Sequence, residues 1–366
     1  MWFKRMDLEV WFNDYQYDVL YDVGESAVKY LTFADLEIDL SQVKIRYGHH
    51  TGRPDLRELI AQQYQGLSSD HIVVTNGASE AIFTVISSLV KPGDHVIIEH
   101  PNYPSLYDIP EGLGCDVSLL HLTFDNQYKP NLDELKGMVT PKTKFIALTH
   151  PNNPTGSMIS EETLREVIRW VEEKDIYLLF DETYREMSFE HTLPPAATLS
   201  AKAISITSMS KCFGLPGIRT GWLATKDPFV LEAVLTTREL VTITNNAFSE
   251  EIAVQVLKEK DSYLNKAKTH IKANREIVSK WMTGHPDIEW IYPEAGVVSL
   301  PRFRSHVKVD PEKVYRRLAE KYKTFVIPGR CFGVDNSYFR LGFGATQDEI
   351  KIGLANIDKA LNDLKE

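Results

Sequence analysis

The sequence predicts an α/β protein: a large three-layer αβα domain around a mostly parallel sheet, with a smaller α+β domain beside it. The length of 366 residues exceeds the usual size of one compact core and indicates two domains. From about residue 70 to 225, short apolar runs alternate with helical stretches, which is typical of a parallel sheet covered on both faces. Beyond residue 228 the pattern becomes mostly helical and then mixed. We therefore assign residues 41–264 to the large domain, and residues 1–40 and 265–366 to the small one.

Six apolar runs predict the strands of the large domain: residues 72–75, 95–100, 144–150, 176–182, 203–210 and 220–225. Helical patterns lie between them, as at residues 79–90 and 161–174. A helical stretch at 251–281 leads to the smaller unit, whose elements are expected at 297–302, 311–322, 338–343 and 347–364. The first 40 residues hold no complete unit and are expected to join this smaller part. Since ligands of open α/β sheets bind beyond the carboxyl ends of the strands, the loops at those ends are the expected site.

Composition excludes several classes of function. The net charge of −10 argues against a nucleic-acid partner, which would need a basic face. Cys115, Cys212 and Cys331 show no CxxC spacing, so neither a disulfide framework nor a metal site is expected, and a reducing compartment follows. No secretory signal and no run of about 18 apolar residues is visible. We expect a cytoplasmic protein with no membrane partner.

Two loops after apolar strands have the makings of an anion or cofactor site. In residues 75–79, a glycine allows a tight turn before Ala78 and Ser79 open a helix, whose free N–H groups suit a phosphate. The same residues would also suit a turn that binds nothing. Residues 150–156, HPNNPTG, form a rigid turn that holds Asn153 at the end of a strand.

The strongest signal is the segment 208–222, in which Lys211 follows an apolar strand with Ser208 before it and Arg219 after it. A lysine held deprotonated forms a Schiff base with an aldehyde, whereas an isolated lysine would be read as a surface residue. Asp181 ends another apolar strand. Its carboxylate is suited to pairing with a pyridinium nitrogen, although a helix cap is the alternative interpretation.

In their order and approximate spacing, these motifs resemble the fold-type I pyridoxal phosphate (PLP) enzymes, in particular the class I/II aminotransferases. The resemblance runs from about Tyr47 to Arg340. It implies PLP as the cofactor and Lys211 as the Schiff-base lysine that moves the proton at the substrate Cα. It also implies that Asp181 pairs with the ring nitrogen, and that Tyr184 and Asn153 hydrogen-bond the phenolic oxygen of the cofactor.

The resemblance also implies roles for residues further along the chain. The residues that match the family's phosphate site are Ala78, Ser79, Ser208 and Arg219. Tyr103 corresponds to the aromatic residue that stacks on the ring, with a locally packed loop tyrosine as the alternative. Tyr47 corresponds to the tyrosine that reaches a neighbouring subunit's phosphate, which implies a homodimer with shared active sites. Arg340 matches the arginine that binds the substrate α-carboxylate together with Asn153, and Gly24 is a looser match beside it, because Glu25-Ser26 stands where the family has a proline-bearing motif.

Several other polar residues match no motif. His49 and His50 are interpreted as lining or surface groups, and His100 and His150 as structural. Cys212 follows the lysine, but nothing in the sequence is placed to activate it as a nucleophile.

The function that the resemblance implies is transfer of an amino group between an amino acid and a 2-oxo acid. The alternative is a PLP-dependent lyase or a specialised biosynthetic enzyme of the capreomycidine-synthase type, which eliminates or cyclises instead. A PLP-sensing transcription regulator is disfavoured, because only about 46 residues, rich in acidic side chains, precede Tyr47. The side chain of the substrate is left open: Arg46, Arg53 and Arg304 are all conceivable partners for a second carboxylate.

Overall fold

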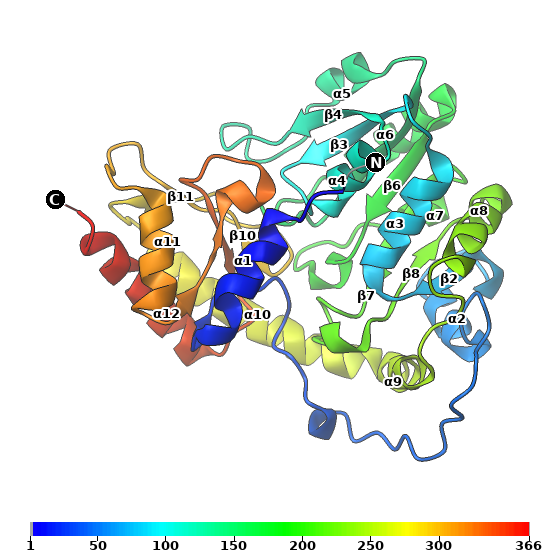
Figure 1. The fold of residues 1–366 in the computed structure, drawn as a ribbon, viewed down its shortest axis with the longest axis horizontal. Helices are drawn as coiled ribbons and strands as arrows, with labels where there is room; N and C mark the ends of the chain where they lie inside the picture. The colour runs from blue at the N-terminus through cyan, green and yellow to red at the C-terminus, as the bar shows by residue number, and fades with distance from the viewer. Residues whose placement is uncertain (1–2, 366) are drawn as a thin grey trace.

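The computed structural model describes residues 3–365, and a seven-stranded sheet forms its centre (Figure 1). The strand order is β2-β8-β7-β6-β5-β3-β4. The strands are β2 (Ile72–Thr75), β3 (His95–His100), β4 (Asp116–His121), β5 (Thr143–Thr149), β6 (Tyr177–Asp181), β7 (Ala203–Ser208) and β8 (Gly221–Ala224). Strands β4, β3, β5, β6 and β7 run parallel, and β8 runs antiparallel to both β7 and β2. The mostly parallel sheet predicted from the sequence is confirmed.

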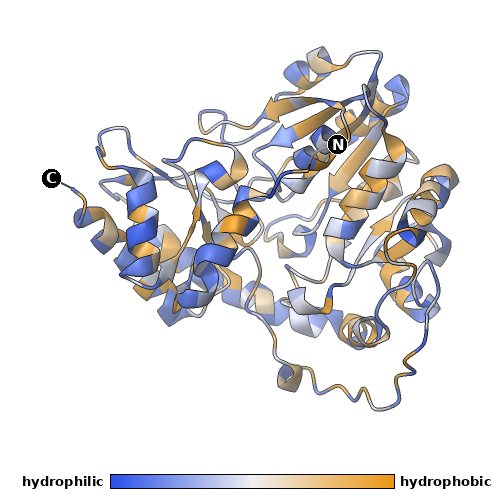
Figure 2. Ribbon diagram, in the orientation of Figure 1, coloured by the Kyte–Doolittle hydropathy of each residue, from blue (hydrophilic) through white to orange (hydrophobic). Residues whose placement is uncertain are grey.

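Helices cover both faces of this sheet and complete three layers. Buried side chains of α3, α4 and α8 pack on one face, and those of α5, α6 and α7 pack on the other. Successive residues of one strand point to opposite faces, so Phe145 joins the first apolar cluster and Ile146 the second. The helices are α2 (Pro54–Ala61), α3 (Gly77–Leu89), α4 (Ser105–Gly112), α5 (Leu132–Met138), α6 (Glu161–Lys174), α7 (Ala196–Leu199), α8 (Pro228–Glu239) and α9 (Ala247–Lys258). In Figure 2 the central strands are accordingly the most apolar part of the ribbon.

The smaller group of elements follows α10 (Lys260–Met282). Its members are β9 (Ile288–Glu289), β10 (Val298–Ser299), β11 (Arg302–Phe303), α11 (Pro311–Glu320), β12 (Thr324–Phe325), β13 (Ile327–Pro328), β14 (Phe339–Gly342) and α12 (Gln347–Asn362). The N-terminal segment lies against them. Strand β1 (Tyr21–Asp22) pairs in parallel with β12, and Trp11 in α1 (Asp7–Tyr15) donates its indole N–H to the Val326 carbonyl at 2.9 Å.

The structure contains elements that the sequence pattern does not predict. Strand β4 lies at the edge of the sheet, where only Leu120 is buried, so its sequence lacks the continuous apolar run of a central strand. Helix α1 begins after Met6, which makes no side-chain cap hydrogen bond, so no start signal marks it. The helical stretch expected at 251–281 is two helices, α9 and α10, that meet at Glu259.

Across residues 3–365, no helix combines the length and the apolar character that crossing a bilayer demands.

Candidate active site

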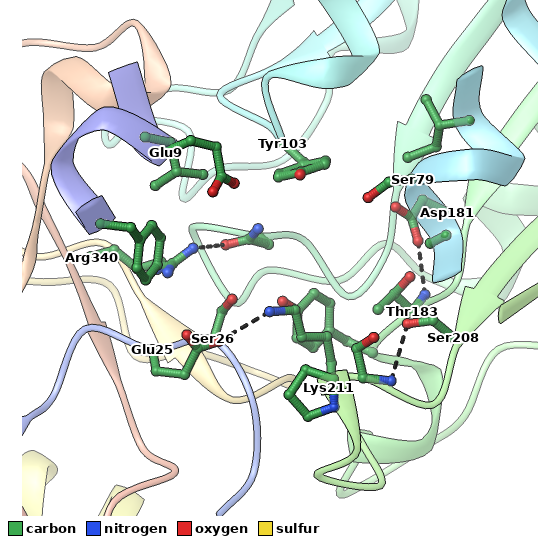
Figure 3. A pocket seen from close by; sticks show the side chains of 18 of the residues that line it. Glu9, Glu25, Ser26, Ser79, Tyr103, Asp181, Thr183, Ser208, Lys211 and Arg340 are labelled. Carbon is green, nitrogen blue, oxygen red and sulfur yellow. Dashed lines mark hydrogen bonds and ion pairs between the residues drawn. The ribbon is translucent and has the colours of Figure 1, made fainter. Parts of the chain in front are cut away.

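A cavity of about 400 Å³ opens at the carboxyl ends of β3, β5, β6 and β7 (Figure 3). Its volume lies within the range of about 300–1,000 Å³ that is usual for small-molecule sites. The loops after these strands supply one wall and the floor, and helix α1 supplies the opposite wall. The sequence-predicted residues that line the cavity are Ala78, Ser79, Tyr103, Asn153, Asp181, Tyr184, Ser208, Lys211, Arg219 and Arg340.

Lys211 lies on the floor of the cavity, three residues after β7 ends. Its side chain is 27% exposed, and its Nζ donates a hydrogen bond to Glu25 Oε1 at 3.0 Å. Burial disfavours the charged form of Glu25, but the positive charges of Lys211 and Arg340 outweigh it and lower the pKa of this carboxyl to about 2. The amine therefore faces a permanently charged carboxylate.

Asp181 is the last residue of β6 and is 6% exposed. Its Oδ1 accepts a hydrogen bond from the Thr183 backbone N–H at 2.9 Å, and burial raises the pKa of the carboxyl. No cationic side chain within residues 3–365 forms an ion pair with it. A buried carboxylate that lines a cavity and has no cationic side chain paired with it is suited to binding a protonated ring nitrogen.

The turn before α3 forms a cradle with Arg219. Gly77 has a φ of +77°, and a Cβ at this position would lie 2.7 Å from Arg219 Nη2, so only glycine suits the turn. Arg219 donates from Nη2 to the Asn76 carbonyl at 3.4 Å. The free N–H groups at the start of the helix, the Ser79 hydroxyl and this guanidinium point to one end of the cavity, where a phosphate would meet each of them.

Arg340 lies in β14 at the other end of the cavity and is 1% exposed. Its Nε donates to the Gly24 carbonyl at 3.0 Å, and its Nη1 donates to Asn153 Oδ1 at 3.1 Å. Nη2 is buried without a hydrogen-bond partner among the described residues. A buried guanidinium edge with free donors is suited to a carboxylate, which accepts two parallel hydrogen bonds from it.

The chain resembles known proteins in both sequence and fold. The family model described as aminotransferase class I and II matches residues 8–357. The chain belongs to this family. This chain is 28% identical to the capreomycidine synthase of Streptomyces vinaceus, over a match that covers 97% of this chain and 93% of that enzyme. A PLP-dependent aminotransferase of Streptococcus suis superposes with a TM-score of 0.94 at 30% identity over 100% of both chains. A PLP-dependent cyclase superposes with a TM-score of 0.90 at 29% identity, over 98% of this chain and 97% of that one.

Pyridoxal phosphate is accordingly the cofactor of this family member. The residues present fit it. The cradle at Gly77 and Arg219 would hold the phosphate, the buried carboxylate of Asp181 would pair with the ring nitrogen, and Lys211 would provide the amine for the aldehyde. In the view of Figure 3, the Tyr103 ring lies at the upper side of the cavity, between Glu9 and Ser79.

Some predicted residues lie outside the cavity. Tyr47 is 81% exposed, and Gly24 meets Arg340 only through its carbonyl, while its N–H donates to Asp22. His49 and His50 are both exposed and do not line the cavity; the His50 Nδ1 pairs with Glu239 at 2.8 Å on the surface.

Cys212, His100 and His150 are buried and do not line the cavity. Burial raises the pKa of the Cys212 thiol, which disfavours the thiolate that a nucleophile needs. Burial, aided by the neighbouring His121, lowers the pKa of His100 to about 4.

Sequence reasoning missed Glu99, a fully buried carboxylate at the end of β3. Its Oε2 accepts hydrogen bonds from the Thr149 backbone N–H at 3.0 Å and from Asn152 Nδ2 at 3.1 Å, and its Oε1 lies 2.9 Å from His150 Nε2. Asn102, beside the ring of Tyr103, contributes a longer contact of 3.4 Å. Glu99 thus joins the loops after β3 and β5, and no sequence motif marks it.

Sequence reasoning also missed Glu9 and Glu25 as lining residues. Glu25 enters the cavity because the N–H groups of Gly24 and Glu25 both donate to Asp22 Oδ1, at 3.0 and 2.9 Å, which turns the chain toward Lys211. The missing proline of the Glu25-Ser26 motif was the available signal. No sequence signal indicated Glu9, because it lies in helix α1, which the sequence pattern did not predict.

Proposed function

We propose that the chain is an aminotransferase that moves an amino group from an amino acid to a 2-oxo acid. The observation that carries the proposal is the placement of Lys211 and the free edge of Arg340 on one cavity, with the carboxylate of Asp181 on its far side (Figure 3). An amine, a group that binds a carboxylate and a carboxylate for the ring nitrogen are the three groups that an α-amino acid bound to PLP would need in one cavity.

Each residue has a defined task in this proposal. Bound PLP supplies an aldehyde that condenses with amines and a ring that withdraws electrons from the substrate Cα. Arg340 binds the α-carboxylate and fixes which Cα bond faces Lys211. Lys211 Nζ takes the proton from Cα, and Asp181 keeps a proton at the ring nitrogen. Asn153 lines the cavity and its Oδ1 is held by Arg340, so its amide N–H groups would be its donors to the cofactor.

A half-reaction tests the proposal. The holoenzyme is mixed with one amino acid at a time, without any 2-oxo acid, and the cofactor is then extracted and identified. Transamination leaves the amine form of the cofactor and one equivalent of a new 2-oxo acid. Extraction of unchanged PLP with every donor, together with release of ammonia or a cyclised product, would refute it.

A second candidate function is elimination or cyclisation at the same Cα. It is favoured by the similarity to capreomycidine synthase over 97% of the chain and to a PLP-dependent cyclase at a TM-score of 0.90. The Cα proton is removed in the same way in all three reactions, so the cavity floor serves each of them. Mass analysis of the product distinguishes cyclisation from transamination, because cyclisation with loss of water lowers the product mass and continues without an acceptor, whereas transamination beyond one turnover requires the acceptor.

The proposal includes a homodimer that acts in the cytoplasm. The segment with Ile45 and Tyr47 lies beside the loop after α8, because the buried Arg238 donates to the His50 carbonyl. Leu240 and Val241 of that loop are also highly exposed. Large apolar side chains exposed on neighbouring segments support a protein interface at this place. Mixed dimers of Lys211→Ala and Tyr47→Ala subunits test site sharing: they should regain one intact active site, and no regain would refute a shared site.

A further inference from the structure

Charged side chains of both signs line the cavity. Among its described lining residues, the cations are Lys211, Arg219 and Arg340, and the carboxylates are Glu9, Glu25 and Asp181. In the function proposed above, every cation has a partner: Arg219 has the phosphate, Lys211 has the cofactor aldehyde, and Arg340 has the α-carboxylate. Asp181 is likewise matched by the ring nitrogen. Glu9 and Glu25 are the two charged lining residues to which the proposed function assigns no partner.

Glu25 holds Lys211 at 3.0 Å in the structure. Once the Lys211 amine has condensed with the cofactor, this carboxylate loses a full ammonium partner. Glu9 has no ion-pair partner within residues 3–365. Glu25 keeps the nearby positive charge of Arg340, so Glu9 is the carboxylate of the described lining that is left without a cation.

Helix α1 determines where the substrate side chain lies. In Figure 3 Glu9 and Arg340 lie at the same end of the cavity, and Asp181 and Ser79 lie at the other. For an amino acid whose carboxylate meets the unpartnered Nη2 of Arg340 and whose Cα meets Lys211, we place the side chain toward α1, because Glu9 lies at the Arg340 end of the cavity. This wall is formed by Leu8, Glu9, Phe12, Asn13, Gln16 and Tyr17.

We infer that the amino acid substrate carries a cationic side chain, a guanidinium or an ammonium group, and that Glu9 is its partner. The inference rests on the proposed placement of the α-carboxylate at Arg340. Phe12 and Tyr17 provide apolar surface for the methylene groups of a long side chain, and the Asn13 amide adds an acceptor beside the Glu9 carboxylate. A second carboxylate would instead meet the field of Glu9 and Glu25 with no free cation from this chain's cavity lining.

Matched donors test the inference. The holoenzyme is assayed with L-arginine and with L-citrulline, which has nearly the same shape but no charge, and with L-glutamate. Because Glu9 is exposed, the specificity constant for arginine should exceed that for citrulline by about twofold to fivefold, which corresponds to the usual strength of an exposed ion pair. Glu9→Gln should remove most of this ratio. Asp14→Asn, on the same helix but outside the cavity, removes an equal charge and should leave the ratio unchanged.

A binding measurement separates this inference from the proposed function. δ-Guanidinovalerate and δ-ureidovalerate both carry the carboxylate for Arg340 but have no α-amino group, so neither reacts. Calorimetry on the holoenzyme should give tighter binding of the guanidino compound, by the same ratio, and Glu9→Gln should equalise the two. Equal binding of both compounds by the wild type, or a preference for L-glutamate, would overturn the inference even if transamination occurs. A charge preference without any amino transfer would uphold it while the proposed function fails.

Discussion

Replacement of Arg340 by alanine tests the assigned orientation of the substrate most directly. Arg340 is almost completely buried, and two of its nitrogens are held by Gly24 and Asn153, so its free edge is fixed before a ligand arrives. Loss of one partner of a buried, hydrogen-bonded charge pair costs about 2–5 kcal/mol of binding free energy. We therefore expect Arg340→Ala to weaken binding of the amino donor by about 30-fold to several thousandfold.

The assay is a double comparison. The dissociation constant of an amino acid and that of its carboxamide are measured for the wild type and for Arg340→Ala, by titration of the cofactor absorbance. The wild type should strongly prefer the acid, and the variant should bind acid and amide within about threefold of each other, because a neutral amide gains little from the guanidinium. Arg340→Lys, which keeps the charge without the planar fork, should give an intermediate value.

Two outcomes would contradict the reasoning. If the variant keeps the full preference for the acid, the α-carboxylate binds elsewhere. If the variant loses binding of acid and amide equally, the change has disturbed the fold, because the Gly24 carbonyl and Asn153 lose their donor. Circular dichroism and the retained affinity for PLP identify this second case.

Three further predictions follow from buried or cavity-lining groups. Lys211→Ala should still bind PLP but give no borohydride-reducible adduct on the protein, whereas the wild type should carry the adduct at Lys211 in peptide mass analysis. Glu99→Gln keeps the volume and one acceptor oxygen for the Thr149 and Asn152 donors, but it places an NH₂ group opposite His150 Nε2 and removes the buried charge from that pair, so urea unfolding should show a loss of about 1–3 kcal/mol of stability. The pKa of His100 is lowered from 6.5 to about 4 by burial and by His121, so the unfolded chain binds more protons between these values and stability falls as the pH drops through that window. His100→Gln should flatten the fall by at most about 3 kcal/mol, and an unchanged slope in pH-dependent unfolding would refute this assignment.

The part of the cavity that the sequence predicted is its floor. Asp181 ends the apolar strand β6, and Lys211 and Asn153 lie a few residues after β7 and β5, so all three gather where the carboxyl ends of parallel strands meet at one edge of the sheet. The continuous apolar runs that mark such strands also indicate where the polar residues behind them will gather. Their roles toward the cofactor stay predictions, as does the reach of Tyr47 into a partner.

The wall at α1 was not predictable from local pattern. Glu9 reaches the cavity because α1 packs on the segment after β12, through the hydrogen bond from Trp11 to the Val326 carbonyl, more than 300 residues away. No capping residue marks the start of the helix, and no sequence pattern predicts a contact between residues so far apart in the chain. Strand β4 was missed for a related reason, since an edge strand of mixed polarity lacks the apolar run of its neighbours.

The origin of α1 in a separate stretch of chain has a consequence for engineering. The floor that we propose for the chemistry comes from the ends of the central strands, while the wall that we propose for the substrate side chain comes mostly from one short helix held on the smaller group of elements. We therefore expect that residues 7–17 can be exchanged as one unit. Grafting the equivalent helix of a relative should transfer donor preference and leave the cofactor chemistry in place.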